Sequence, residues 1–266
     1  MPHELIKAQG EFAMIRVLHK AFDMLELLAA EPARRKKLNE IAPGLHIHPA
    51  TCANILKTMV SRNYVDQVAP RAGYALGPMI YQLAHRGAYR GDLTGAAEPL
   101  MSALAKKVNE TVLLATLRGG KRFIVAQIDG RQTIQVDRNL FSQDTIYQTA
   151  TGRLLLAYLD ERNLNTVISE QGLPAARWPE ADSLSKLKVE LEKIRRRKWV
   201  CHQTDNGVMG IAYPVSENSE VVAALGLFLP AFRFKGAHKI ALTKGMSATS
   251  AAISARLSDD QKNIKP

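Results

Sequence analysis

The feature that most constrains the fold is the stretch of residues 48–62, which reads HPATCANILKTMVSR. Its apolar side chains recur at the spacing of one face of an α-helix, and that face must be buried: they are Cys52, Ile55, Leu56, Met59 and Val60. The opposite side carries little charge for a solvated helix and consists of Ala50, Asn54, Lys57, Thr58 and Ser61. His48 stands at the N-cap and Pro49 at the first helical position, where a missing N–H costs nothing. The pattern predicts a helix with one buried face and one small, mostly uncharged face.

The flanking segments predict a winged helix-turn-helix around this helix. Residues 15–30 form an amphipathic helix by pattern, with apolar positions at Val17, Leu18, Ala21, Phe22, Leu25 and Leu28. A shorter helix over about 38–43 points Leu38 and Ile41 inward, and His46 follows in a turn where glycine often adopts the left-handed conformation. The APRAG turn at 69–73 separates two short antiparallel strands. Helix, helix, turn, helix and hairpin is the order of that motif.

Charge and cysteine content narrow the class of protein. Lys and Arg number 36 against 25 Asp and Glu, a formal net charge of +11, which suits a polyanionic partner such as nucleic acid. No apolar run reaches the roughly 18 residues that cross a bilayer. With only two cysteines and no secretion signal, we expect a cytoplasmic protein without disulfides, metal or cofactor.

The remainder of the chain predicts an α+β domain around an antiparallel sheet. Strand-like runs occupy 111–119, 121–130, 133–139, 207–215 and 220–229. Helical patterns occupy 97–110, 149–159, 183–198 and 237–257, and in the third of these Leu184, Leu187, Leu191 and Ile194 point inward. Residues 201–205 are expected to form a loop. Helices before and after a group of strands indicate this fold class.

Several stretches, in order from Val17 to Leu257, resemble the IclR family of bacterial transcription regulators. The motifs are RVLHKAFDMLELLA, the segment LNEIAPGLHIHPATCANILKTMVSRNYV, NETVLLATLRGGKRFIVAQID, TATGRLLLAYL, LKVELEKIRRRKWV and GVMGIAYPVSENSEVVAALGLFLPAF. The resemblance implies a winged helix-turn-helix DNA-binding domain at 1–76, a linker helix at 77–91, a GAF-like effector-binding domain at 92–258 and a polar tail at 259–266. It implies a homodimer or homotetramer that binds palindromic operator DNA and responds to a small-molecule effector.

Under this resemblance the exposed face of residues 49–62 enters the major groove, which displays a distinct pattern for each base pair. Ala50 and Thr51 allow close approach to base edges, and Asn54 pairs with an adenine. Lys57 and Arg62 face phosphates or guanine, and Arg71 at the wing tip reaches the backbone or the minor groove. Electrostatic support comes from Arg34, Arg35 and Lys37. The family often has Arg in place of Asn54, so the resemblance does not specify the operator sequence.

The resemblance also implies an effector cavity over the sheet. Free N–H groups and the positive dipole end at a helix start suit a carboxylate, which points to Thr149, Ala150, Thr151 and Gly152. Leu113 and Val208 would be apolar lining. Gly210, Gly226 and Phe228 stand where some members carry hydroxyl or thiol groups, so the expected ligand is larger or more aromatic than a two- or three-carbon acid. His202, Gln203 and Asp205 complete the set, in a loop about two residues shorter than the family's.

Four alternatives compete with this interpretation. Cys201 and His202 could be a nucleophile and base, but adjacent strand residues point to opposite faces, so we expect no enzyme. His46, His48 and Cys52 could bind zinc, although Cys52 lies on the buried face and no fourth ligand is evident. A ligand sensor could instead regulate through protein contacts. The second domain could also serve only in assembly, with an empty pocket.

Overall fold

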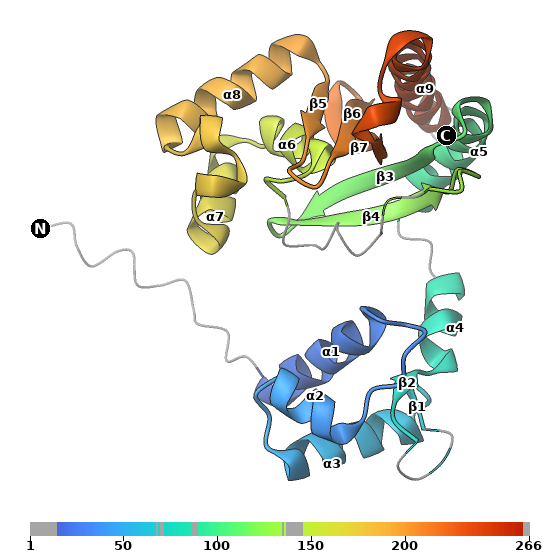
Figure 1. The fold of residues 1–266 in the computed structure, drawn as a ribbon, viewed down its shortest axis with the longest axis vertical. Helices are drawn as coiled ribbons and strands as arrows, with labels where there is room; N and C mark the ends of the chain where they lie inside the picture. Colours follow the sequence, from blue (N-terminus) through green and yellow to red (C-terminus); the bar gives the residue numbers. More distant parts are fainter. Residues whose placement is uncertain are drawn as a thin grey trace, which may run out of the picture. The chain divides into compact units, whose positions relative to one another are not determined.

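The computed structural model describes residues 15–67, 69, 72–86, 90–134, 136 and 146–262. The chain divides into two compact units, Met1–Ala88 and Tyr89–Pro266, and each is described by itself (Figure 1). Within the described ranges, no helix combines the length and apolar character that a bilayer span requires.

The first unit is a winged helix-turn-helix, as the sequence predicts. Its elements are α1 (Arg16–Ala29), α2 (Leu38–Gly44), α3 (Pro49–Ser61), β1 (Val65–Asp66), β2 (Ala75–Leu76) and α4 (Pro78–Arg86). β1 and β2 pair antiparallel. A further bridge ties the wing to the segment before α2: the Lys36 N–H donates to the Tyr74 carbonyl at 3.0 Å, and the Tyr74 N–H donates to the Lys36 carbonyl at 2.8 Å. The base of the wing is therefore fastened to the entry of the helix-turn-helix.

The turn before α3 has the predicted geometry. His46 adopts a left-handed conformation with φ of 52°. His48 is the N-cap residue, and its Nδ1 accepts a hydrogen bond from the Ala50 N–H at 3.3 Å. Pro49 occupies the first turn, where no N–H is needed. These local interactions set the start of α3.

The core of the first unit confirms the buried face of α3 and corrects that of α1. Cys52, Ile55, Leu56 and Met59 are buried against residues of α1 and α2. In α1, however, only Met24 and Leu28 are buried, whereas Val17, Leu18 and Phe22 are exposed at 51%, 49% and 58%. The apolar pattern of α1 covers two faces, and only one of them meets the core of this unit.

The second unit is a five-stranded antiparallel sheet between two layers of helices in the described part of the chain. Its main elements are α5 (Gly91–Val108), β3 (Thr111–Arg118), β4 (Lys121–Ile128), α6 (Ala150–Ala157), α7 (Glu161–Gln171), α8 (Leu184–Arg197), β5 (Val200–Gln203), β6 (Val208–Glu217), β7 (Glu220–Pro230) and α9 (Gly236–Lys262). The strand order is β4-β3-β7-β6-β5, and every neighbouring pair is antiparallel.

One strand prediction and one loop prediction were wrong. The stretch 133–139 was expected to be a strand, but Thr133, Ile134 and Val136, its described residues, lie outside any strand. The segment expected as a loop instead begins with β5, which pairs with β6 from Val200↔Ala212 to Gln203↔Met209. A segment is a strand where a neighbouring strand supplies its backbone partners, and β6 supplies them for β5.

The two faces of the sheet bury different helices. On β3, Val112 and Leu114 join the core under α5 and α9, whereas Leu113 and Ala115 join the core under α6 and α8 (Figure 1). This is the two-residue period of a strand covered on both faces. In α8 the side chains of Leu187, Leu191 and Ile194 are buried as predicted, but Leu184 is exposed. α9 continues through Lys262 and includes the first residues of the stretch expected as a tail.

A buried ion pair holds the start of β3 to the segment before α9. Arg233 follows β7, and its Nε and Nη2 donate to the two carboxylate oxygens of Glu110 at 2.8 and 2.6 Å. Glu110 is only 2% exposed, and His238 Nε2 lies 3.2 Å from its Oε1. The remaining Arg233 nitrogen, Nη1, donates to the Ile134 carbonyl at 3.0 Å. The pair thus joins three segments that are distant in the sequence.

Candidate nucleic-acid interface and ligand cavity

The outer face of α3 is open in its own unit. Ala50, Asn54 and Lys57 are exposed along it, and Thr51 is half-buried. Two hydroxyls on this face bond only to the helix itself: Thr58 Oγ1 donates to the Asn54 carbonyl at 3.1 Å, and Ser61 Oγ donates to the Thr58 carbonyl at 2.8 Å. Among the described residues, no hydrogen bond uses the Asn54 side-chain amide. Its donor and acceptor are therefore available to an external partner.

In the basic segment before α2, residues 34–37, the side chains of Arg34 and Arg35 already form ion pairs. Arg34 bonds to Glu40 and lies 3.4 Å from Glu31, and Arg35 lies 3.2 Å from Asp66. These side chains are largely exposed, so each pair contributes little to stability and can exchange partners. Lys37 is exposed, and its backbone N–H donates to Glu40 at 2.8 Å.

Two basic residues complete the predicted interface. Arg62 is the exposed C-cap residue of α3. Arg71, predicted to lie at the wing tip, falls outside the described residues. α3 itself contains no Asp or Glu, so its outer face presents neutral and basic groups. Such a face is compatible with the phosphate-lined groove of a duplex.

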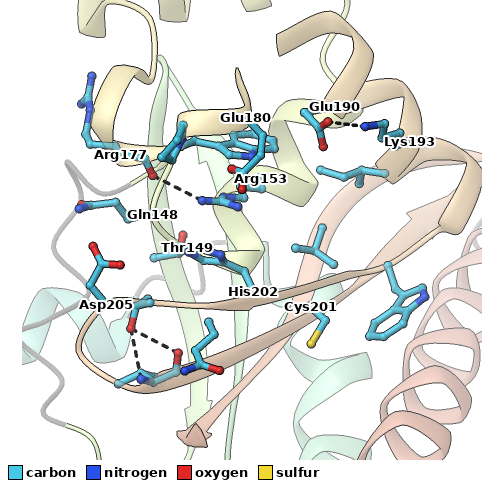
Figure 2. A pocket seen from close by; sticks show the side chains of 18 of the residues that line it. Gln148, Thr149, Arg153, Arg177, Glu180, Glu190, Lys193, Cys201, His202 and Asp205 are labelled. Atoms are coloured by element: carbon cyan, nitrogen blue, oxygen red, sulfur yellow. Dashed lines mark hydrogen bonds and ion pairs between the residues drawn. The ribbon is translucent and has the colours of Figure 1, made fainter. Parts of the chain in front are cut away.

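A cavity of about 560 Å³ opens in the second unit at the β5 edge of the sheet (Figure 2). The start of α6, the helix α8, β5 and two short 3₁₀ turns, η2 (Ala175–Arg177) and η3 (Pro179–Ala181), supply its lining. The predicted residues found in it are Thr149, His202, Gln203, Asp205 and Val208.

Of the remaining predicted residues, Gly152 is in neither lining, and the other six lie around a much smaller void of about 20 Å³ beside the cavity. They are Leu113, Ala150, Thr151, Gly210, Gly226 and Phe228. Five residues of the cavity also line this void, and three of them, Thr149, His202 and Val208, were predicted. A void of this size holds about one water molecule. Most of the open volume is therefore beside β5, whereas the resemblance implied that it lies over the sheet.

Three glycines explain why the space over the sheet is small. A Cβ on Gly226 would lie 2.5 Å from Thr151 Cγ2, and one on Gly210 would lie 3.2 Å from Ala150 Cβ. Both glycines of the sheet thus allow α6 to approach closely. In α6, a Cβ on Gly152 would lie 2.0 Å from the Ile146 carbonyl oxygen. At these three glycines α6 packs directly on the sheet and on the Ile146 segment, which leaves little room for a ligand.

Arg153 is the cavity residue that sequence reasoning missed. It ends the TATGR turn, yet its side chain is only 7% exposed. Nε donates to the Tyr147 carbonyl at 2.7 Å, and the guanidinium carbon lies 4.2 Å from the centre of the Trp178 ring. Among the described residues, no carboxylate lies within ion-pair distance of it. Burial lowers the pKa of Arg153 to about 10, which leaves it charged at neutral pH.

A buried guanidinium without a carboxylate partner is suited to an anionic ligand. The adjoining Thr149 caps α6, because its Oγ1 accepts from the Gly152 N–H at 3.1 Å. Arg122 is a second buried arginine that was not predicted; it is 2% exposed, lines the small void, and burial lowers its pKa to about 10. The sequence signal for Arg153 is an arginine at the start of a helix that is otherwise apolar.

His202 and Cys201 do not form an activated pair. Burial is the main cause that lowers the pKa of His202 to about 4, and the charge of Arg153 lowers it further, so the imidazole is neutral at pH 7. Burial raises the pKa of the Cys201 thiol, which keeps it protonated. A cysteine nucleophile requires the opposite shift in its pKa.

The possible zinc site of the first unit does not assemble. Cys52 is fully buried in the core, and His48 Nδ1 accepts the α3 cap hydrogen bond. Across the part of the chain that the structure describes, no three His, Cys, Asp or Glu residues form a group that could hold a metal ion.

Comparisons with known proteins agree with both units. The family model described as bacterial transcriptional regulator IclR C-terminal matches residues 86–255, and the IclR helix-turn-helix domain matches residues 17–69. The regulator XynR of Escherichia coli K12 is 25% identical over 219 residues, covering 80% of this chain and 86% of XynR. KdgR of Dickeya chrysanthemi is 24% identical over 223 residues, covering 83% of this chain and 72% of KdgR.

Solved structures share the fold. A regulator from Alicyclobacillus acidocaldarius has a TM-score of 0.77 at 23% identity and covers 92% of this chain and 100% of its own. An IclR homolog from Microbacterium hydrocarbonoxydans, complexed with 4-hydroxybenzoate, has a TM-score of 0.74 at 19% identity and covers 91% of this chain and 98% of its own. By the match to more than half of its residues, the chain belongs to the IclR family of bacterial transcriptional regulators.

Proposed function

We propose that this transcriptional regulator binds a palindromic operator as a homodimer or a pair of dimers, and that a small organic acid or aromatic metabolite controls it. The observation that carries the proposal is the open outer face of α3, mounted on a packed core and free of acidic side chains. An α-helix fits the major groove, where side chains reach base edges. Binding to operator DNA places the protein in the bacterial cytoplasm.

The individual contacts follow from side-chain chemistry. The Asn54 amide can donate to and accept from an adenine edge, and the small residues Ala50 and Thr51 let α3 approach the bases. Lys57 and Arg62 contact phosphates or guanine, and Arg71 contacts the backbone or the minor groove. Arg34, Arg35 and Lys37 add sequence-independent attraction.

An exposed apolar stripe on α1 supports association between copies. Leu18 and Phe22 of α1 and the preceding N-cap residue Ile15, at 49%, 58% and 61% exposure, are spaced at i, i+3 and i+7 along the chain. Burial of such a stripe against a second copy removes apolar surface from water. A palindromic operator needs two recognition helices related by a two-fold axis, which a dimer provides.

The cavity supports control by an organic acid. Its volume of about 560 Å³ is within the range of small-molecule sites, roughly 300–1,000 Å³. Arg153 offers a buried positive charge, and Gln148, Thr149 and His202 add polar groups. The Microbacterium homolog of the same fold is complexed with an aromatic acid, 4-hydroxybenzoate, which favours this ligand class.

The test of the DNA interface compares Asn54→Ala with Arg71→Ala on a randomised duplex library at several salt concentrations. Asn54→Ala is expected to relax base preference at one position by about 1–3 kcal/mol. Arg71→Ala should weaken all sequences alike and reduce the salt slope by about one ion. Equal loss on every sequence for Asn54→Ala would overturn its assignment.

The same assay separates the alternatives. A regulator that acts through protein contacts would bind duplex DNA weakly and without a steep salt dependence. An assembly domain with an empty pocket would show no change of operator affinity with any ligand, since an effector shifts only the equilibrium between states that it binds unequally.

A further inference from the structure

The cavity beside β5 is lined by charges of both signs. Its basic residues are Arg153, Arg177, Lys193 and Arg197, and its acidic residues are Glu180, Glu190 and Asp205. Some of these charges are already engaged within the protein. Glu190 Oε1 lies 2.6 Å from Lys193 Nζ, and the Arg177 guanidinium donates to the carbonyls of Gln171, Leu173 and Pro174. The Glu190–Lys193 pair is neutral as a whole. Arg177 is held by three backbone carbonyls, against two for Arg153, and is less buried, so we take Arg153 as the main cationic anchor of the cavity.

Among the described lining residues, the charges without an oppositely charged side-chain partner are Arg153, Arg197, Glu180 and Asp205, and Arg153 is the buried one of these four. Its guanidinium bonds only to backbone carbonyls, those of Tyr147 and Arg177. Glu180 and Asp205 are exposed at the cavity, and within the described residues neither carboxylate has a hydrogen bond or an ion pair. Figure 2 shows the Glu180 side chain next to Arg153 and that of Asp205 farther along the cavity.

This arrangement discriminates among ligands by charge. A ligand that is only anionic would gain from Arg153 but would be repelled by the carboxylates of Glu180 and Asp205. A ligand that is only cationic would be attracted by these carboxylates but repelled by Arg153. His202 is neutral at pH 7, so it neither attracts nor repels a charged ligand through a net charge. A ligand with both signs can satisfy the buried Arg153 and also the carboxylates of Glu180 and Asp205.

We propose that the cavity takes an amphoteric ligand, of the amino-acid or betaine class, whose carboxylate binds Arg153 and whose cationic group faces Glu180. The inference rests on the proposed function, since it specifies the ligand of the same effector cavity. The carboxylate forms charge-assisted hydrogen bonds with the guanidinium nitrogens, and the ammonium group neutralises the field of Glu180. Asp205 offers a second acidic contact to a longer ligand.

The test measures binding of matched ligand sets to the full-length protein by calorimetry. Each set compares a zwitterion with an acid that lacks its cationic group and with an amine or ammonium ion that lacks its carboxylate. The sets are L-phenylalanine, 3-phenylpropionate and phenethylamine; L-leucine, 4-methylpentanoate and isopentylamine; and glycine betaine, acetate and tetramethylammonium. In at least one set the zwitterion is expected to bind about tenfold more tightly than its acid and its amine.

Variants then assign the two ends. Glu180→Gln, at an exposed position, should lower the affinity for the zwitterion and raise that for the acid, which removes the preference. Arg153→Lys, which keeps the charge but not the fork of donors, should weaken the zwitterion and the acid alike. Glu161→Gln is the matched control, because Glu161 pairs with Lys188 and does not line the cavity, and it should leave all affinities unchanged.

Two results would overturn the inference: every acid binds as tightly as its zwitterion, or no member of any set binds. Neither result touches the proposed function if another organic acid alters operator affinity. Failure of the proposed function has a separate signature, which is the absence of operator binding or of any response to ligands of every charge class.

Discussion

Gly152→Ala is expected to destabilise the second unit strongly. A Cβ at this position would lie 2.0 Å from the Ile146 carbonyl oxygen and 2.8 Å from Thr149 Oγ1. The first neighbour is backbone and cannot rotate away, so α6 or the Ile146 segment must move by more than an ångström. Forced overpacking of this kind costs about 3 kcal/mol, and disturbance of the Thr149 cap adds about 1 kcal/mol. The expected loss is about 4 kcal/mol.

Gly95→Ala is the matched control with the opposite sign. Gly95 lies inside α5 and is exposed, and apart from its chain neighbours and the adjoining helix backbone no heavy atom of the described residues lies within 4 Å of the Cβ it would gain. Alanine is the better helix former, so this change should stabilise the unit by about 1 kcal/mol. The two variants make the same chemical change in helices of the same unit, and only the surroundings differ.

The assay is urea unfolding followed by tryptophan fluorescence. The chain has two tryptophans, Trp178 and Trp199, and both lie in the second unit, so the emission reports on that unit. With a slope of about 2 kcal/mol per molar urea, the midpoint should fall by about 2 M for Gly152→Ala and rise by about 0.5 M for Gly95→Ala. A midpoint for Gly152→Ala at or above that of the unmodified protein would refute the packing argument.

Two further predictions use the same assay. Arg233→Gln leaves the carboxylate of Glu110, which is 2% exposed, without its bidentate partner and should lower the free energy of unfolding by about 3–5 kcal/mol. The double variant that also carries Glu110→Gln should recover much of this loss. A double variant no more stable than Arg233→Gln alone would contradict the ion-pair account. His202 has a folded-state pKa of about 4, below the 6.5 of a free histidine, so the unfolded chain binds more protons between these values. The contribution of His202 to stability should therefore be fully present above about pH 6.5 and should decline as the pH falls toward 4. His202→Gln should reduce this decline when midpoints at pH 7 and pH 5 are compared; an unchanged pH dependence would argue against a neutral, half-buried imidazole.

The DNA-binding unit could be predicted well because its signals are local. The spacing of Cys52, Ile55, Leu56 and Met59 defines the buried face of α3 within a few turns, and His48 with Pro49 defines its start. α1 was predicted less well, since apolar residues occupy two of its faces. Periodicity identifies an amphipathic helix but does not reveal which apolar face the rest of the unit covers.

The sheet and the cavity depended on contacts between distant segments. β5 has the sequence VCHQ, which carries no clear alternation, and it is a strand because β6 pairs with it. Arg153 is buried by Trp178, 25 positions later in the chain, and by the Tyr147 carbonyl. No local pattern reports such a meeting. The cap residue Thr149 could be predicted, because its bond to Gly152 spans one helical turn.

The backbone bridge between Lys36 and Tyr74 has a consequence for where regulatory mutations can lie. It joins the base of the wing to the entry of α2, and one shared core holds α1, α2 and α3 together. We therefore expect the helix-turn-helix and its wing to move as one rigid body. Ligand binding elsewhere in the protein can then change the position of this DNA-binding body only as a whole. If the proposed function holds, mutants that lose the response to a ligand but keep normal operator affinity should accordingly map outside α1, α2, α3 and the two strands of the wing.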